Sequence, residues 1–202
     1  MSLFLEKSNM RILFFIPILF FSLFISCTGN KSSEDEAEIA NFKEIIVQKE
    51  DSLLQFQKEN KQIPREKHFE LIQSLNDFYL TFPKDKYAPV CLDKIQMSYS
   101  GLGVYHRAIE YADLLIKKYP KYINRPMILE SQASNYDIFQ QPRDTVKVRY
   151  YYELLLKENP KLDKDKKEGI EMRLEHLDLN FDEYIDFITN SVSSSIQTQA
   201  KP

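Results

Sequence analysis

Residues 89–122 read PVCLDKIQMSYSGLGVYHRAIEYADLLIKKYPKY, and this stretch decides the fold. Leu92, Ile95 and Tyr99 recur at the spacing of one face of an α-helix. A second set of apolar residues follows Gly103, a residue type that lets the chain reverse direction within a short turn. The stretch therefore predicts two antiparallel helices joined by a tight connection.

The second of these helices carries a wider apolar face. Its apolar positions are Tyr105, Ala108, Ile109, Ala112, Leu115, Ile116 and Tyr119. Ala108 is small, which suits a point where two helices approach closely. Pro120 ends the helix, because its ring and its missing N–H do not fit a helix interior.

The end of this second helix recurs elsewhere in the chain. The related segments are residues 75–84, 112–121 and 152–161, and each closes with a Pro-Lys pair. Their prolines are spaced by 37 and then 40 residues, and another proline follows six positions after the first two, at Pro89 and Pro126. A period of this length predicts a stack of helical hairpins.

Residues 89–122 resemble a tetratricopeptide repeat in their apolar positions, in the Leu102-Gly103 turn and in the closing Pro120. The next unit starts at Pro126 and extends to residue 161. Its corresponding apolar positions are Leu129, Ala133 and Tyr136 in the first helix, and Val148, Tyr152 and Leu155 in the second.

This next unit departs from the repeat in three places. Gln132 stands where an apolar residue is expected, and Val148 replaces a small alanine. The turn at residues 140–144 is longer, and Asp144 is expected to cap the helix that follows.

Weaker copies are expected on both sides, because terminal repeats cap a stack and are atypical. Residues 69–82 resemble the second helix of a degenerate first unit, and residues 166–179 resemble the first helix of a final one. A short amphipathic segment at 181–188 and a disordered polar tail at 191–202 complete the C-terminal part. The predicted fold class is an all-α, short tetratricopeptide-like helical-hairpin solenoid over residues 63–190.

Residues 37–62 contain neither Gly nor Pro and carry a helical apolar stripe. We favour an amphipathic helix packed on the following domain over a short coiled coil, because Lys49 occupies one heptad seam position. The sequence leaves both open.

The N-terminus has the features of a secretory signal. Lys7 and Arg11 precede an apolar stretch at 12–25 whose fourteen residues span about 21 Å as a helix, short of a hydrocarbon core of about 30 Å. We therefore expect a signal peptide over residues 1–26, with Met1 or Met10 as the start.

The end of this segment, Leu23-Phe24-Ile25-Ser26-Cys27, resembles the lipobox of bacterial lipoproteins. The resemblance implies that Cys27 is acylated, palmitate included. The small and polar residues that follow, with the acidic cluster at 34–36, predict a flexible tether over 27–36. The whole plan resembles envelope tetratricopeptide lipoproteins, among them the β-barrel-assembly lipoproteins of the BamD type. It implies a lipid-anchored envelope protein, expected at the outer membrane and facing the periplasm, with the cell surface as the alternative.

Composition and motifs argue against several other classes. The chain is 43% hydrophobic with a formal net charge of −3, so nucleic-acid binding is not expected. Three scattered His residues lack the spacing of a metal site. Gly101-Leu102-Gly103 is no nucleotide loop, because His106 takes the place of the third glycine. We expect neither an enzyme nor a cofactor.

Two residue types have competing interpretations. Cys91 is expected to be a small buried apolar residue rather than a reactive thiol. Most of the twelve Tyr residues are expected to fill the interior, with Tyr122 and residues 150–152 left as candidates for contact with a partner.

The function expected from these features is a scaffold that holds another envelope protein or peptide, with outer-membrane protein assembly as its context. The alternative is a cell-wall or glycan-binding module without catalysis. First helices of such stacks line a concave groove, and the positions expected there are Asp93, Met97, Glu130, Ser134 and Asp137. Their three carboxylates predict a ligand of basic or polar character.

Overall fold

The computed structural model describes the backbone of residues 33–199, with side chains to Ser191. The expected signal peptide, Cys27 and the first part of the tether lie outside this range. The elements are α1 (Ser33–Lys58), α2 (Arg65–Thr81), α3 (Ala88–Gly101), α4 (Tyr105–Lys118), α5 (Arg125–Ser134), η1 (Asn135–Phe139), α6 (Thr145–Glu158), α7 (Lys164–Glu175) and α8 (Phe181–Gln199). No strand occurs within residues 33–199, so the all-α prediction is confirmed.

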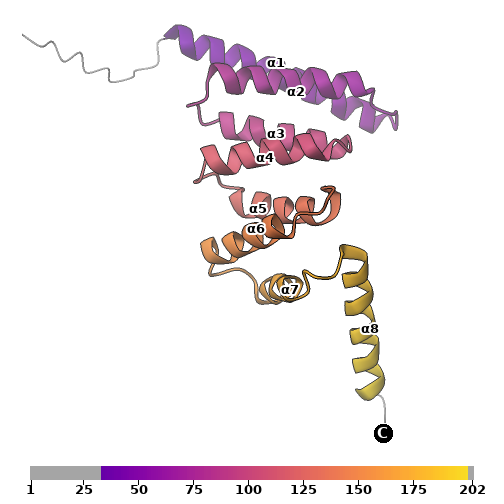
Figure 1. Ribbon diagram of the computed structural model, residues 1–202. Helices are drawn as coiled ribbons and strands as arrows, with labels where there is room; N and C mark the ends of the chain where they lie inside the picture. The colour runs from indigo at the N-terminus through magenta and orange to yellow at the C-terminus, as the bar shows by residue number, and fades with distance from the viewer. Residues whose placement is uncertain (1–32, 200–202) are drawn as a thin grey trace, which may run out of the picture.

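Helices α1 to α6 lie in antiparallel pairs that stack one on the next (Figure 1). The main contacts join elements that follow each other in the chain, from α1 with α2 to α6 with α7. Helix α8 projects away from the stack at its far end (Figure 1). Because each helix from α1 to α7 packs on its neighbours in sequence, this part of the molecule is held together by contacts between consecutive elements.

The turn between α3 and α4 lies where the sequence places it. Gly103 has a φ of +70°, a conformation that a residue with a Cβ adopts at a cost. The Val104 N–H donates to the Tyr99 carbonyl at 2.9 Å and closes the end of α3. This glycine therefore lets α4 turn back along α3.

The residues before the three repeated prolines share one backbone conformation. Phe82, Tyr119 and Asn159 have φ between −124° and −127° and ψ between 57° and 68°. Each donates its N–H to the carbonyl four residues earlier, at 2.8, 2.9 and 3.1 Å. A residue before proline is pushed out of the α region, so each Pro-Lys pair ends its helix in the same way.

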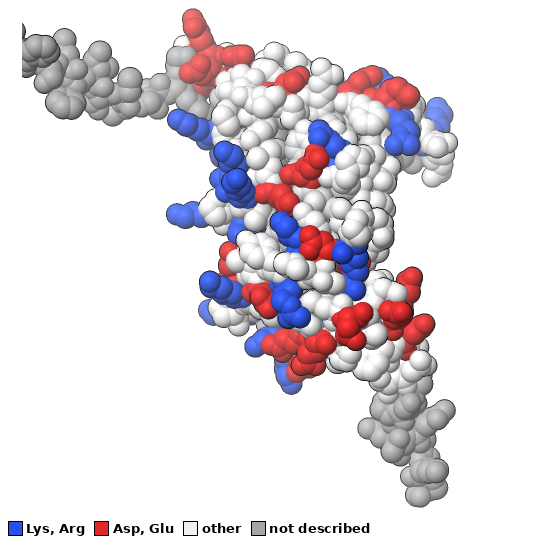
Figure 2. Space-filling view, viewed as in Figure 1, with Lys and Arg blue, Asp and Glu red and all other residues white. Residues whose placement is uncertain are grey.

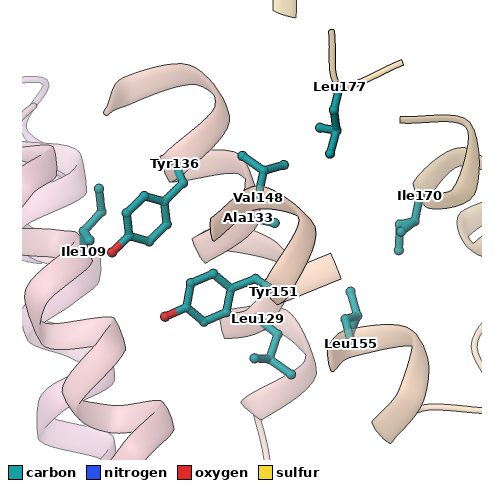
Figure 3. Packing of buried hydrophobic residues seen from close by; sticks show 9 residues of the cluster. All are labelled: Ile109, Leu129, Ala133, Tyr136, Val148, Tyr151, Leu155, Ile170 and Leu177. Atoms are coloured by element: carbon teal, nitrogen blue, oxygen red, sulfur yellow. The ribbon is translucent and has the colours of Figure 1, made fainter. Parts of the chain in front are cut away.

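Three clusters of buried apolar side chains run through the stack. One joins α1, α2 and α3, one joins α3, α4 and the start of α5, and one joins α4 to α7. Figure 3 shows the last, whose labelled members are Ile109, Leu129, Ala133, Tyr136, Val148, Tyr151, Leu155, Ile170 and Leu177. Burying each large side chain contributes about 1.5–3 kcal/mol.

The two departures from the repeat pattern that concern helix positions, Gln132 and Val148, are accommodated in and beside this cluster. Val148 is fully buried where the smaller alanine was expected. Gln132 is also fully buried, and its Nε2 donates to the Ile109 carbonyl at 2.9 Å and to Asp113 Oδ1 at 2.6 Å. Because these bonds satisfy the amide, a polar residue fits an apolar position.

Asp144 caps α6 as predicted: its carboxylate accepts from the Lys147 N–H at 3.0 Å. The π-helical turn η1, by contrast, has no counterpart in the expected pattern. It continues α5, and the Gln140 N–H donates to the Asn135 carbonyl, five residues earlier, at 2.9 Å.

Two expected boundaries differ from the structure. Helix α1 begins at Ser33, inside the expected tether, and its first turn carries Glu34, Asp35 and Glu36, which are favourable at a helix N-terminus. It packs on α2 of its own chain, in line with the interpretation we favoured. Helix α8 extends to Gln199, well past the expected start of a disordered tail at 191.

Candidate interaction surfaces

Of the five positions expected in a groove, Asp93 is buried and satisfied inside the molecule. Its carboxylate accepts hydrogen bonds from Gln96 Nε2 at 3.0 Å, Tyr122 Oη at 2.9 Å and Asn124 Nδ2 at 3.2 Å. Tyr122 and Asn124 lie in the connection that leads into α5. Asp93 therefore ties α3 to that connection and is not exposed to a ligand.

Asp137 is buried in the same way. It pairs with Arg173 of α7 at 2.8 Å and with Arg143 of the α6 entry at 2.6 Å. A buried carboxylate needs such partners, because desolvation without them is costly. This ion cluster links η1 to α7.

The two remaining polar positions are half-buried and also have partners within the chain. Glu130 pairs with Lys166 at 2.5 Å, and Ser134 hydrogen-bonds to Tyr152. The expectation of three carboxylates free for a basic ligand is therefore wrong for Asp93 and Asp137, which are buried, while Glu130 lies at the surface in an ion pair. Each carboxylate is bonded to a later part of the chain. Met97 differs, with 61% of its surface exposed.

Met97 lines an open groove of about 370 Å³ between the C-terminal half of α1, the start of α2 and the C-terminal half of α3. We call it the α1–α3 groove. Its lining residues are Glu50, Leu53, Leu54, Gln57, Ile63, His68, Leu71, Lys94, Met97 and Ser98. Leu54 of α1, which is 49% exposed, lines the groove together with Met97 of α3.

An ion pair fixes the two walls of this groove. Lys94 of α3 donates to Glu50 of α1 at 2.6 Å and to the Tyr87 hydroxyl at 3.3 Å. Burial opposes the charge on Lys94, but the hydrogen bonds to Glu50 and Tyr87 outweigh it and raise the lysine pKa. Lys94 therefore stays charged and holds α1 against α3.

A second surface lies at the other end of the helices, along the turns after α2, α4 and α6. We call it the lysine edge. Its members are Lys84, Lys86, Lys117, Lys118, Lys121, Lys157 and Lys161, all exposed. Lys and Arg side chains gather along this side of the molecule, at the left of Figure 2.

Asp113 of α4 organises a polar cluster in the interior. It accepts from Gln132 at 2.6 Å, from the Tyr136 hydroxyl at 3.0 Å and from the Tyr151 hydroxyl. Burial, and then the interaction with Asp113, raises the pKa of both tyrosines, so both remain protonated donors. Because every partner is occupied, the cluster serves to hold α4, α5 and α6 together.

The other residue-level expectations have mixed outcomes. Cys91 is fully buried, and burial raises its thiol pKa to about 12, which fits a packing role. Tyr150 is exposed, but Tyr151 is buried and Tyr122 is half-buried, so most of the tyrosines proposed for partner contact are used inside the molecule.

Neither a metal centre nor a membrane span was found in the part of the chain that the structure describes. Within residues 33–199 no three His, Cys, Asp or Glu side chains gather as metal ligands would. In the same range no helix combines the length and apolar character needed to cross a bilayer.

The sequence interpretation missed the lysine edge and most of the α1–α3 groove. For the edge there was a signal: Lys84, Lys121 and Lys161 directly follow the three repeated prolines. For the groove there was little, since its lining comes from three segments whose association depends on the register of α1 against α3.

Comparisons with models of protein families, with curated proteins and with solved structures found no match to this chain.

Proposed function

We propose that this protein is a lipid-anchored scaffold of the bacterial cell envelope that holds another protein in the α1–α3 groove. The observation that carries the proposal is the groove itself. Leu54 and Met97 leave apolar surface exposed on facing helices, where an unbound protein gains nothing by exposing it. Apolar side chains of an incoming helix or peptide fit a groove of this kind.

The shape and chemistry of the groove favour a protein over a small molecule. The groove is open, and its less exposed apolar lining residues are Leu53, Ile63 and Leu71. The main charged groups at its rim, Glu50 and Lys94, are paired with each other. A small-molecule site usually encloses its ligand, and this groove is open.

Further support comes from the repeated hairpins and from the N-terminal sequence. The shared geometry before Pro83, Pro120 and Pro160 supports a tetratricopeptide-like architecture, in which stacked hairpins present a surface to a partner. The lipobox-like sequence that ends in Cys27 supports anchoring. By its resemblance in architecture, we place the scaffold in outer-membrane protein assembly, facing the periplasm.

Photocrosslinking in native membranes tests the scaffold. A photoreactive amino acid at Met97 of the full chain is expected to give a discrete protein adduct that mass spectrometry identifies. Met127 of α5 is the matched control, because it is similarly exposed, at 67%, but does not line the α1–α3 groove. Equal adducts from both positions, or adducts with glycan alone, would contradict the proposal; the glycan result would favour the cell-wall-binding alternative.

The anchor has a separate test. Blocking lipoprotein signal processing with globomycin should leave the unprocessed chain, whose mass exceeds that of the mature acylated form beginning at Cys27. An unchanged mass would contradict acylation of Cys27.

A further inference from the structure

The lysine edge carries charge that the protein itself does not neutralise. Among the described residues, none of its seven ammonium groups has an ion-pair or hydrogen-bond partner. The seven come from the connections after α2, α4 and α6 and from the last turns of α4 and α6. Lys and Arg side chains gather along this side of the molecule (Figure 2). A chain of net negative charge therefore presents a concentrated positive edge.

Apolar and aromatic surface lies among these lysines. A groove of about 520 Å³ is floored by Pro89, Val90, Tyr119, Pro120, Tyr122 and Ile123 and rimmed by Lys86, Lys118 and Lys121. Ile123 is 85% exposed, the highest exposure of any large apolar side chain in the described part of the chain. Lysines around tyrosine and aliphatic side chains are the composition of surfaces that lie at a membrane interface.

The chain enters the stack at this same end. Phe42, in the N-terminal half of α1, packs on Phe82 in the turn after α2, with ring centroids 5.7 Å apart. Lys43 reaches Asp85 of that turn at 3.4 Å. The segment that precedes α1, with Cys27 in it, is therefore joined to the molecule beside the lysine edge (Figure 1).

The acidic groups nearest this edge lie at the starts of α1 and α7, in the connection after α2 and at the end of α6. Glu34, Asp35 and Glu36 lie in the first turn of α1, next to the α2 turn. Asp85 is buried against Lys43, and Glu158 pairs with Arg125 at 2.7 Å. Lys117, Lys118 and Lys121 therefore keep their net positive charge, whereas Asp163 and Asp165 at the start of α7 partly offset the lysines after α6.

We propose that the lysine edge docks on the anionic phospholipid surface of the membrane that anchors the chain, with Ile123 inserted among the headgroups. The proposal rests on the anchoring proposed above. Docking at this edge turns the opposite ends of the helices, where the α1–α3 groove lies, away from the bilayer. Because the anionic membrane surface attracts the lysines electrostatically, binding of the lysine edge to the membrane weakens as the salt concentration rises.

The test uses the full chain reconstituted into vesicles, with a polarity-sensitive fluorophore on Lys121→Cys. Cys91 is buried and stays unlabelled in the folded chain. Lys58→Cys, at the far end of α1, is the matched control position. In vesicles of phosphatidylcholine with one third phosphatidylglycerol, the Lys121 probe is expected to report an apolar environment and to be quenched by lipid-borne nitroxide. In pure phosphatidylcholine the probe at position 121 is expected to report an aqueous environment. The probe at position 58 is expected to report an aqueous environment in both lipids.

Charge reversal identifies the lysines as the cause. The double variant Lys118→Glu with Lys161→Glu is expected to lower the docked fraction about tenfold or more. The control double variant Lys58→Glu with Arg65→Glu changes the net charge by the same amount and is expected to leave the docked fraction unchanged. A Lys121 probe that reports water in both lipids overturns the proposal. So does a probe that responds only to an added acidic polypeptide, which would assign the edge to a protein partner. Co-flotation with phosphatidylcholine vesicles tests the lipid anchor separately from the lysine edge. Phosphatidylcholine carries no net charge, so the lysines do not contribute to binding of these vesicles.

Discussion

At the scale of single residues, buried and half-buried polar side chains hold the helices of the stack together. Asp93, Asp113 and Asp137 each accept hydrogen bonds from residues of a later element. A hydrogen bond to a buried acceptor adds only modestly to the free energy of unfolding. A buried donor that loses its acceptor lowers the free energy of unfolding by about 1–3 kcal/mol. The loss of one such carboxylate is therefore felt more strongly than the gain of any one bond suggests.

Asp113→Ala leaves the Tyr136 and Tyr151 hydroxyls and the Gln132 amide without their shared acceptor. We expect it to lower the free energy of unfolding by about 2–4 kcal/mol, measured by urea denaturation. Glu171→Ala removes an exposed carboxylate and is expected to change stability by less than about 0.5 kcal/mol. Equal effects from the two variants would show that Asp113 does not link the helices.

The raised pKa of Tyr136 and Tyr151 predicts a loss of stability in alkali. Both groups have a higher pKa when folded than the usual 10.0 of the unfolded chain, so the unfolded state loses its protons first. Their contribution is fully present below pH 10.0 and declines as pH rises toward the folded pKa. Tyr151→Phe should lessen this decline, as followed by circular dichroism against pH; an equally steep decline in the variant would contradict the assignment.

Residue-level burial was the least predictable part of the candidate site. The helical pattern placed Asp93 and Asp137 on first helices correctly, but their partners Tyr122 and Arg173 lie 29 and 36 residues further along the chain. A single sequence gives the face on which a carboxylate lies and not the donor that the next repeat brings to it.

At the scale of elements, proline and glycine set where helices stop. The shared conformation of Phe82, Tyr119 and Asn159 follows from the proline after each, and this is why the repeated Pro-Lys pairs predicted the helix ends well. The ends without such a residue were predicted less well. The polar composition after residue 190 indicated a disordered tail. The apolar residues nevertheless keep a helical spacing beyond that point, and α8 extends to Gln199.

Gly103 and Gly101 offer a matched pair of substitutions in one turn. A Cβ added at either position would meet no neighbouring atom within 4 Å. Of the two glycines, only Gly103 has a positive φ. Gly103→Ala should therefore cost about 1–2 kcal/mol through backbone strain alone. Gly101→Ala, within α3, should be neutral or stabilising by up to about 1 kcal/mol. Thermal unfolding of both variants decides this, and a stabilising Gly103→Ala would contradict the φ assignment.

At the scale of the whole molecule, the stack behaves as a one-dimensional series of neighbours. Helices α3 and α4 pack on each other and on neighbours on both sides. Helix α8 touches the stack mainly near its own start. There the Arg173 Cζ lies 4.6 Å from the centroid of the Tyr184 ring, and the ring centroids of His176 and Phe187 are 4.4 Å apart. Stability is then expected to be a sum over helix pairs and the interfaces between them, and the last element is the least supported.

Hydrogen exchange should reveal this gradient. Amides of α3 and α4 are expected to exchange at rates close to those of global unfolding, whereas amides of α8 should exchange far faster through local opening. Mass spectrometry of peptides from both regions measures the difference. Protection of α8 equal to that of α4 would show that α8 has a partner surface not accounted for by this packing.

The two exposed surfaces lie at opposite ends of the helices, and this arrangement gives the proposed scaffold its polarity. The lysine edge lies beside the point where the chain enters α1, and the α1–α3 groove lies toward the other end of that helix. A partner held in the groove is then offered away from the membrane.

The central claim, capture of a protein by this groove, is tested most directly by the yield of the Met97 photoadduct in native membranes, with and without Leu54→Glu. A charge on the facing wall should remove a central apolar contact worth about 2 kcal/mol or more, which corresponds to a fall in yield of about thirtyfold. The adduct should persist when the same charge is placed at Met127. An undiminished adduct in the Leu54→Glu chain would contradict the account.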